Sequence, residues 1–113
     1  MNREIKFRSF VNNNKCIYFD FGNIRDLNFE EMRGYDIQEY TGLKDKNGKE
    51  IYEGDVIYRS SNNEYLKVAF SNLGCWKFEN KDFQYYTINM NVKNGSLSTC
   101  EVIGNIYENP ELL

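Results

Sequence analysis

The sequence predicts a mostly β fold with one short helix, and two observations about composition carry this prediction. Aromatic residues make up 16% of the 113 residues, and Ala69 is the only alanine, so the intrinsic preference is for strands rather than helices. Asparagines are frequent, often beside glycine or beside each other, and they tolerate the backbone conformations of turns. Length and composition fit one globular domain over residues 1–113, with apolar surface for a single core and not for two.

The N-terminal third predicts a β-hairpin followed by a short helix. Residues 3–10 and 16–21 are expected to pair as strands, with Lys6 and Arg8 on the polar face of the first.

The helix is expected between Gly22 and Gly34. Asn28 is a suitable N-cap, Glu31 stands where a capping box places it, and Gly34 suits the position after the last turn. Phe29 and Met32 are expected to share one face of this helix.

Turn signals divide the rest of the chain into short strands. Residues 36–40 are expected to form a strand, and Asn47-Gly48 between extended flanks indicates a tight hairpin turn. Five further strands are expected at regular spacing, at residues 55–59, 64–70, 75–79, 84–91 and 101–107, with turns at 60–63, 71–74, 80–83 and 93–96. This order is similar to that of SH3-like barrels, in which a Gly-Asp turn opens the first strand. The sequence therefore predicts a small SH3-like barrel in the C-terminal half, preceded by the N-terminal hairpin and helix.

The composition argues against an enzyme. The sequence contains no histidine, the usual general base near neutral pH and the commonest metal ligand. Cys16, Cys75 and Cys100 are far apart in the sequence and odd in number, so neither a CxxC knuckle nor a disulfide framework is expected. We therefore expect no catalytic residues, no metal and no cofactor. The cysteines, together with an N-terminus that lacks an apolar signal segment, favour a reducing cytoplasm, and no membrane span is expected.

Three segments resemble a known family. These are REIKFR (residues 3–8), YTGLKDKNGKEIYEGDVI (residues 40–57) and EVIGNIYENP (residues 101–110), which in this order resemble the YopX family of small bacteriophage and prophage proteins. Ser9-Phe10 departs from the family, whose members tend to have a small residue followed by tryptophan. The resemblance implies a phage or prophage origin and a β-rich fold. It implies no established activity and no catalytic residues.

The central segment offers a candidate binding site. Its expected hairpin carries Lys44, Lys46 and Lys49 near the tip, where protruding cations and backbone amides could receive an anionic group. The alternative is purely structural: the glycines of this segment serve turns with positive φ, and Asp55 braces a turn. Residues 41–55 contain three lysines and four acidic residues, which favours the structural alternative.

A second candidate surface is aromatic. Trp76, Tyr85 and Tyr86 lie near lysines and could stack on nucleic-acid bases. Against this stands a pI near 5.0. The N-terminal fifteen residues are basic and the last thirteen acidic, which predicts either a basic contact strip or two surfaces that complement each other.

The sequence as a whole favours a non-enzymatic module for protein interaction or assembly. Its expected partner is a host or phage protein, or a second copy of the chain through exposed rings or strand edges. A nucleic-acid-binding accessory protein is the alternative.

Overall fold

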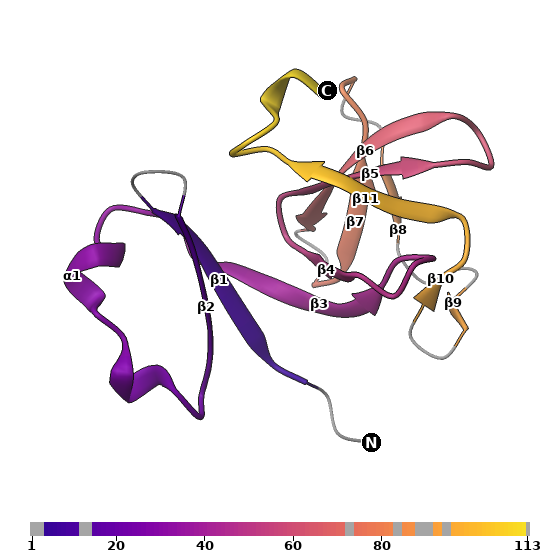
Figure 1. Cartoon of the computed structure of the whole chain (residues 1–113). Coiled ribbons are helices and arrows are strands. Elements are labelled where there is room, and N and C mark those ends of the chain that lie inside the picture. Colours follow the sequence, from indigo (N-terminus) through magenta and orange to yellow (C-terminus); the bar gives the residue numbers. More distant parts are fainter. Residues whose placement is uncertain are drawn as a thin grey trace.

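The computed structural model describes residues 4–11, 15–71, 74–82, 85–87, 92–93 and 96–112. Strands dominate these residues, with one short α-helix, so the mostly β prediction is confirmed (Figure 1). The elements are β1 (Lys6–Val11), β2 (Lys15–Asp20), η2 (Ile24–Asp26), α1 (Phe29–Met32), β3 (Gln38–Lys44), β4 (Glu50–Tyr52), β5 (Asp55–Arg59), β6 (Glu64–Phe70), β7 (Trp76–Glu79), β8 (Tyr85–Thr87), β9 (Val92–Lys93), β10 (Ser96–Leu97), β11 (Cys100–Asn105) and η3 (Pro110–Leu112).

The strands form two sheets. The first has the order β2-β1-β3-β10-β9, with β4 also pairing with β3, and the second has the order β11-β5-β6-β7-β8. The N-terminal hairpin prediction is confirmed, because β1 and β2 are antiparallel with Phe7 opposite Phe19. Strand β3 pairs with β1 near its start and with β4 further along, so it carries the chain from the hairpin to the C-terminal sheet (Figure 1).

The helix prediction is confirmed at both ends. The Glu31 backbone N–H donates to the Asn28 side chain at 3.3 Å, and Gly34 has a φ of +85° just beyond the C-cap. The expected shared face is wrong: Met32 is buried, whereas Phe29 is 60% exposed. A helix of a single turn presents only Met32 to the hairpin.

The predicted strands of the C-terminal half are confirmed where they are described, although the last, expected at residues 101–107, is β11 and already ends at Asn105. Strands β5 and β6 match the expected ranges residue for residue, and Asn63 in the turn between them adopts a φ of 53°. Strand β7 begins one residue later than expected, and β8 covers only the described part of 84–91. Of the turn predicted at residues 93–96, Lys93 lies in β9 and Ser96 in β10, and residues 94–95 lie outside the described residues.

The predicted SH3-like barrel is not confirmed. Among the described residues, β11 and β8 are the two edges of the second sheet and do not pair with each other. The first sheet instead supplies the other side of the core, because Ile51 of β4 and Leu97 of β10 are buried against Ile57, Leu66 and Phe78 of the second sheet.

The apolar side chains form two clusters, so the expectation of a single core is wrong. The larger, here called the sheet core, has eight buried residues: Ile51, Ile57, Leu66, Val68, Phe78, Leu97, Cys100 and Val102. The smaller, here called the hairpin core, has three: Val11, Phe19 and Met32. It lies where α1 and the neighbouring chain cover one face of the β1–β2 hairpin, which stands away from the second sheet (Figure 1).

Candidate functional site

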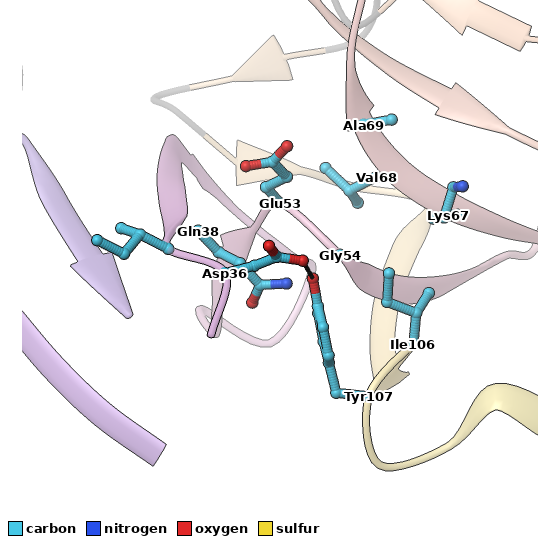
Figure 2. A pocket seen from close by; sticks show the side chains of 10 residues that line it. Asp36, Gln38, Glu53, Gly54, Lys67, Val68, Ala69, Ile106 and Tyr107 are labelled. Carbon is cyan, nitrogen blue, oxygen red and sulfur yellow. Dashed lines mark hydrogen bonds between the residues drawn. The ribbon is translucent and has the colours of Figure 1, made fainter. Parts of the chain in front are cut away.

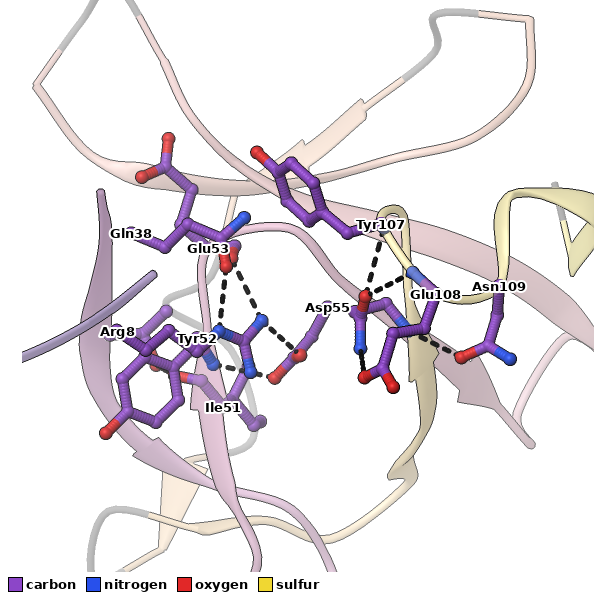
Figure 3. Close-up of polar contacts among 11 residues, drawn as sticks. Arg8, Gln38, Ile51, Tyr52, Glu53, Asp55, Tyr107, Glu108 and Asn109 are labelled. Atoms are coloured by element: carbon purple, nitrogen blue, oxygen red, sulfur yellow. Dashed lines mark hydrogen bonds and ion pairs between the residues drawn. The ribbon is translucent and has the colours of Figure 1, made fainter. Parts of the chain in front are cut away.

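A buried arginine lies between the two cores. Arg8 of β1 is only 5% exposed, and its guanidinium donates to the Asp55 carboxylate at 2.7 Å and to the Gln38 side-chain oxygen at 2.7 Å (Figure 3). A third, longer bond of 3.2 Å reaches the carbonyl of Glu53. Arg8 therefore joins the N-terminal hairpin to β3 and to the start of β5.

Aromatic rings enclose the same guanidinium. The Arg8 carbon Cζ lies 4.8 Å from the ring centre of Phe10 and 4.7 Å from that of Tyr52. Such contacts favour arginine over lysine because the planar cation stacks on rings while its edge donates hydrogen bonds.

Asp55 is the counter-ion and also holds the turn before β5. Its second oxygen accepts the backbone N–H of Tyr52 at 2.8 Å, which confirms that Asp55 braces this turn. Burial raises the pKa of Asp55, and the attraction of Arg8 opposes that rise without cancelling it. The pair is thus a desolvated contact that depends on both of its members.

The Gln38 amide has a fixed orientation and an unused donor. Arg8 has only donors, so the atom that faces it must be the amide oxygen and the other must be the nitrogen. Within the described ranges, that nitrogen is the one buried side-chain N or O atom with no hydrogen-bond partner. An unpaired buried donor typically costs about 1–3 kcal/mol, so it calls for an explanation.

Gly54 allows the amide to approach the backbone. Its φ is +86°, and a Cβ at this position would lie 2.4 Å from the Gln38 amide nitrogen and 3.2 Å from a ring carbon of Tyr107. The Gly54 N–H and carbonyl both form backbone hydrogen bonds, to Val68 and from Ile106. The glycine is therefore required by its conformation and by the side chains that pass over it.

A pocket of about 320 Å³ opens beside Gln38 and Gly54, here called the junction pocket (Figure 2). Its polar side chains are Asp36, Gln38, Glu53, Lys67 and Tyr107, and its apolar ones include Ile37, Val68 and Ile106. Tyr107 is held at the edge because its hydroxyl donates to Asp36 at 3.3 Å and its ring stacks on that of Phe10 at 5.4 Å between centres.

One wall of the junction pocket carries negative charge, from Glu53 and Asp36. Burial raises the pKa of Glu53, a hydrogen bond with the Glu39 backbone opposes the rise, and the carboxylates of Glu39 and Asp36 add to it. Burial also raises the pKa of Tyr107, and the neighbouring Gln38 amide partly offsets that rise. The pocket can therefore bind polar groups.

The three predicted lysines do not converge. Lys46 pairs with Glu101 at 3.6 Å, whereas Lys49 borders a separate hollow that also contains Arg8 and Asp55. Lys44 is exposed at the end of β3. The structure thus does not gather them into one anion site.

The hairpin of these lysines is organised by Asp45, which is 1% exposed. Its carboxylate accepts the backbone N–H groups of Asn47, Lys49 and Val102, each at 2.9 Å. Gly42, Gly48 and Gly54 all have positive φ, as the structural alternative expected.

The predicted aromatic surface is only partly described. Trp76 is half-buried, packs against the sheet core and makes an edge contact with Phe70 at 5.0 Å between ring centres. Tyr85 and Tyr86 belong to β8, and their side chains lie outside the described residues.

The basic N-terminal residues are paired within the chain. Lys6 contacts Glu4 and Glu50, Arg8 contacts Asp55, and Lys15 contacts Glu31 at 2.7 Å. The expected pairing of this segment with the acidic C-terminus is not seen in these contacts, because all the acids come from the chain before residue 56.

Sequence reasoning missed Arg8 and Gln38 as site residues. Arg8 was placed with Lys6 on a polar face, and Gln38 lies in a predicted strand between an exposed isoleucine and a glutamate. Gly54-Asp55 was the available signal, since it marked the position that both of them contact.

Two features are absent from the described residues. No group of three or more Cys, Asp or Glu side chains there could hold a metal ion. Nor does any helix found there have the length and hydropathy to cross a membrane.

Fold and site together define a small two-sheet β protein with a buried arginine at the junction of its two cores. A family model described as YopX protein matches residues 3–113, so the chain belongs to the YopX family, and the resemblance is confirmed. Among solved structures, the fold is similar to that of protein EF1440 from Enterococcus faecalis, with a TM-score of 0.58 and 22% identity over 99% of both chains. At this identity the likeness concerns the fold alone. No curated protein matches the chain.

Proposed function

We propose that this YopX chain is a phage or prophage accessory protein that acts without catalysis, by binding a protein partner at the junction pocket. The observation that carries the proposal is the make-up of the pocket: a buried polar floor at Gln38 and an exposed apolar rim. Ile37 is 55% exposed and Tyr107 is 42% exposed at that rim. The phage origin rests on the family resemblance.

A rim of this kind favours a protein partner. Aromatic and aliphatic side chains that remain exposed beside a concave site commonly mark interaction surfaces, and fixed rings lose little conformational freedom on binding. Tyr107 is such a ring, because Phe10 and Asp36 already hold it. The pairing of Lys6, Arg8 and Lys15 with acids argues against the nucleic-acid alternative, which needs a basic face.

The test compares two exposed apolar positions. Ile37→Lys changes the rim, and Phe70→Lys is the matched control, since Phe70 is 52% exposed on the second sheet. Tagged wild-type and variant chains are used to capture partners from bacteria that carry the phage. We expect a protein that Phe70→Lys retains and Ile37→Lys loses at least about tenfold, which corresponds to about 1.4 kcal/mol.

Two measurements separate the alternatives. Light scattering reports self-association as a mass above the 13.4 kDa of one chain. Fluorescence anisotropy with single- and double-stranded oligonucleotides reports nucleic-acid binding, which would weaken steeply with added salt. Salt-sensitive oligonucleotide binding, or a captured protein that Ile37→Lys and Phe70→Lys affect equally, would contradict the proposal.

A further inference from the structure

We propose that the junction pocket receives an arginine residue of the partner, whose main-chain carbonyl accepts the Gln38 amide and whose guanidinium lies against Glu53 and Asp36. This deepens the proposed function and rests on it, because the ligand is taken to be part of a protein.

The first step is the free donor of Gln38. The side chain is 2% exposed, its oxygen is committed to Arg8, and its nitrogen has no partner. Figure 2 shows the nitrogen directed toward the space beside Tyr107 and Gly54. Since the nitrogen can only donate, the group that completes it must be an acceptor, and a peptide carbonyl is the acceptor that every protein partner carries.

The second step is the charge of the walls. Asp36 and Glu53 lie on the pocket, and Lys67 is its one cation among the residues that line it. The carboxylates of Glu39 and Asp36 also act on Glu53, so a cation that enters on this side offsets repulsion as well as gaining attraction. The charge complement of this wall is therefore positive.

The third step is the choice of arginine. A guanidinium is planar, always charged and carries several donors, so it can bond to two carboxylates at once. It can also stack on the exposed Tyr107 ring, as Arg8 stacks on Phe10 and Tyr52 on the other side of Gln38. A residue that combines this side chain with its own carbonyl satisfies both the free donor and the acidic wall.

A structural explanation competes with this proposal. The Gln38 nitrogen lies near the Tyr107 hydroxyl, which itself donates to Asp36. If the amide served only to position Tyr107, a ligand would leave its signals unchanged. The side-chain amide resonances of Gln38 therefore distinguish the two explanations directly.

The experiment is an NMR titration of the 15N-labelled full chain with Nα-acetyl-arginine N-methylamide. The same compound with citrulline in place of arginine is the neutral isostere. Glu53→Gln removes one wall charge, and Glu30→Gln is the matched control because Glu30 is exposed on α1. Each spectrum also reports whether the variant is folded, so a loss of binding is not confused with a loss of fold.

We expect the arginine probe to shift the Gln38 side-chain amide signals and to bind at least about tenfold more tightly than the citrulline probe. Glu53→Gln should weaken arginine binding by a similar factor, and Glu30→Gln should leave it unchanged. Equal binding of both probes, equal effects of the two variants, or Gln38 signals that stay unmoved at saturation would each overturn the inference. Because the titration uses no partner, its failure leaves the partner-binding proposal standing, whereas a captured protein that Ile37→Lys and Phe70→Lys affect equally contradicts that proposal even if the arginine probe binds.

Discussion

The sheet core contains eight buried residues, whereas the hairpin core contains three, yet both belong to one chain of modest length. The C-terminal region buries its side chains between two sheets. The N-terminal hairpin has one short helix to cover it and reaches the rest of the molecule through its pairing with β3, the ion pair of Lys6 with Glu50, and Arg8 with the rings around it. The comparison teaches that one region is stabilised mainly by apolar burial and the other also depends on a buried ion pair.

The largest effect is expected from Arg8→Met, which breaks the link between the two regions. It leaves Asp55 buried without its counter-ion, which typically costs about 3–5 kcal/mol of unfolding free energy. Urea denaturation followed by the fluorescence of Trp76, the single tryptophan, would measure this loss.

The pH dependence of that loss tests its cause. Burial raises the pKa of Asp55 and Arg8 opposes the rise, so without Arg8 the folded-state pKa is higher still. A raised carboxyl pKa gives stability that is present below the unfolded pKa and is lost as the pH rises through the folded pKa. The deficit of Arg8→Met should therefore shrink toward acid pH, and an equal deficit at pH 7 and pH 4 would show that charge is not the reason.

Two single substitutions, one in each core, compare the two cores directly. Leu66→Ala in the sheet core should cost about 3 kcal/mol and lower amide-exchange protection throughout β5, β6 and β7. Met32→Ala in the hairpin core should lower protection chiefly in β1, β2 and α1. If Met32→Ala lowers protection in the second sheet as much as Leu66→Ala does, the two regions unfold as one unit.

Alanine substitutions at two glycines with the same backbone conformation separate the cost of backbone strain from the cost of steric crowding. Gly48 and Gly54 have φ near +85°, but only at Gly54 does a Cβ meet neighbours, the Gln38 amide and the Tyr107 ring. Gly48→Ala should cost about 1 kcal/mol for the left-handed conformation, and Gly54→Ala about 2 kcal/mol or more. Equal thermal midpoints for the two variants would mean that Gln38 is not held where we place it.

The smallest effect is expected from Glu53→Gln. Burial raises the pKa of Glu53, so its charged form lowers the stability of the fold at neutral pH. Removing the charge should raise the unfolding free energy at pH 7, by at most about 1 kcal/mol because the carboxylate is partly exposed. The gain should vanish below the ordinary pKa of glutamate, and a loss at pH 7 would indicate that the bond with the Glu39 backbone dominates.

Local pattern was enough to predict most strands. Strands β5 and β6 are bounded by turn residues such as Asn63, so their ends could be predicted from nearby residues alone. Asn28 and Gly34 marked the helix for the same reason. The packing of the two sheets brings Leu97 of the first sheet into one core with Leu66 of the second, and these residues are distant in sequence, so the open arrangement could not be predicted.

The site was harder to predict because the burial of its residues depends on partners that are distant in sequence. Arg8 alternates with apolar neighbours as any exposed strand cation does, and only Asp55, 47 positions away, makes its burial possible. For Gln38, the neighbouring residues in the sequence give no indication that its side chain is buried. The three lysines of the central hairpin could be predicted to lie near its tip, but the pairing of Lys46 with the distant Glu101 could not.

The Val102 backbone N–H donates to Asp45, which joins the central family segment to the closing one, and the Lys46 N–H donates to the Cys100 carbonyl beside it. Because these segments bond to each other, they have to be exchanged together. A chimera that takes the 40–57 segment from a relative should therefore also take its 101–110 segment.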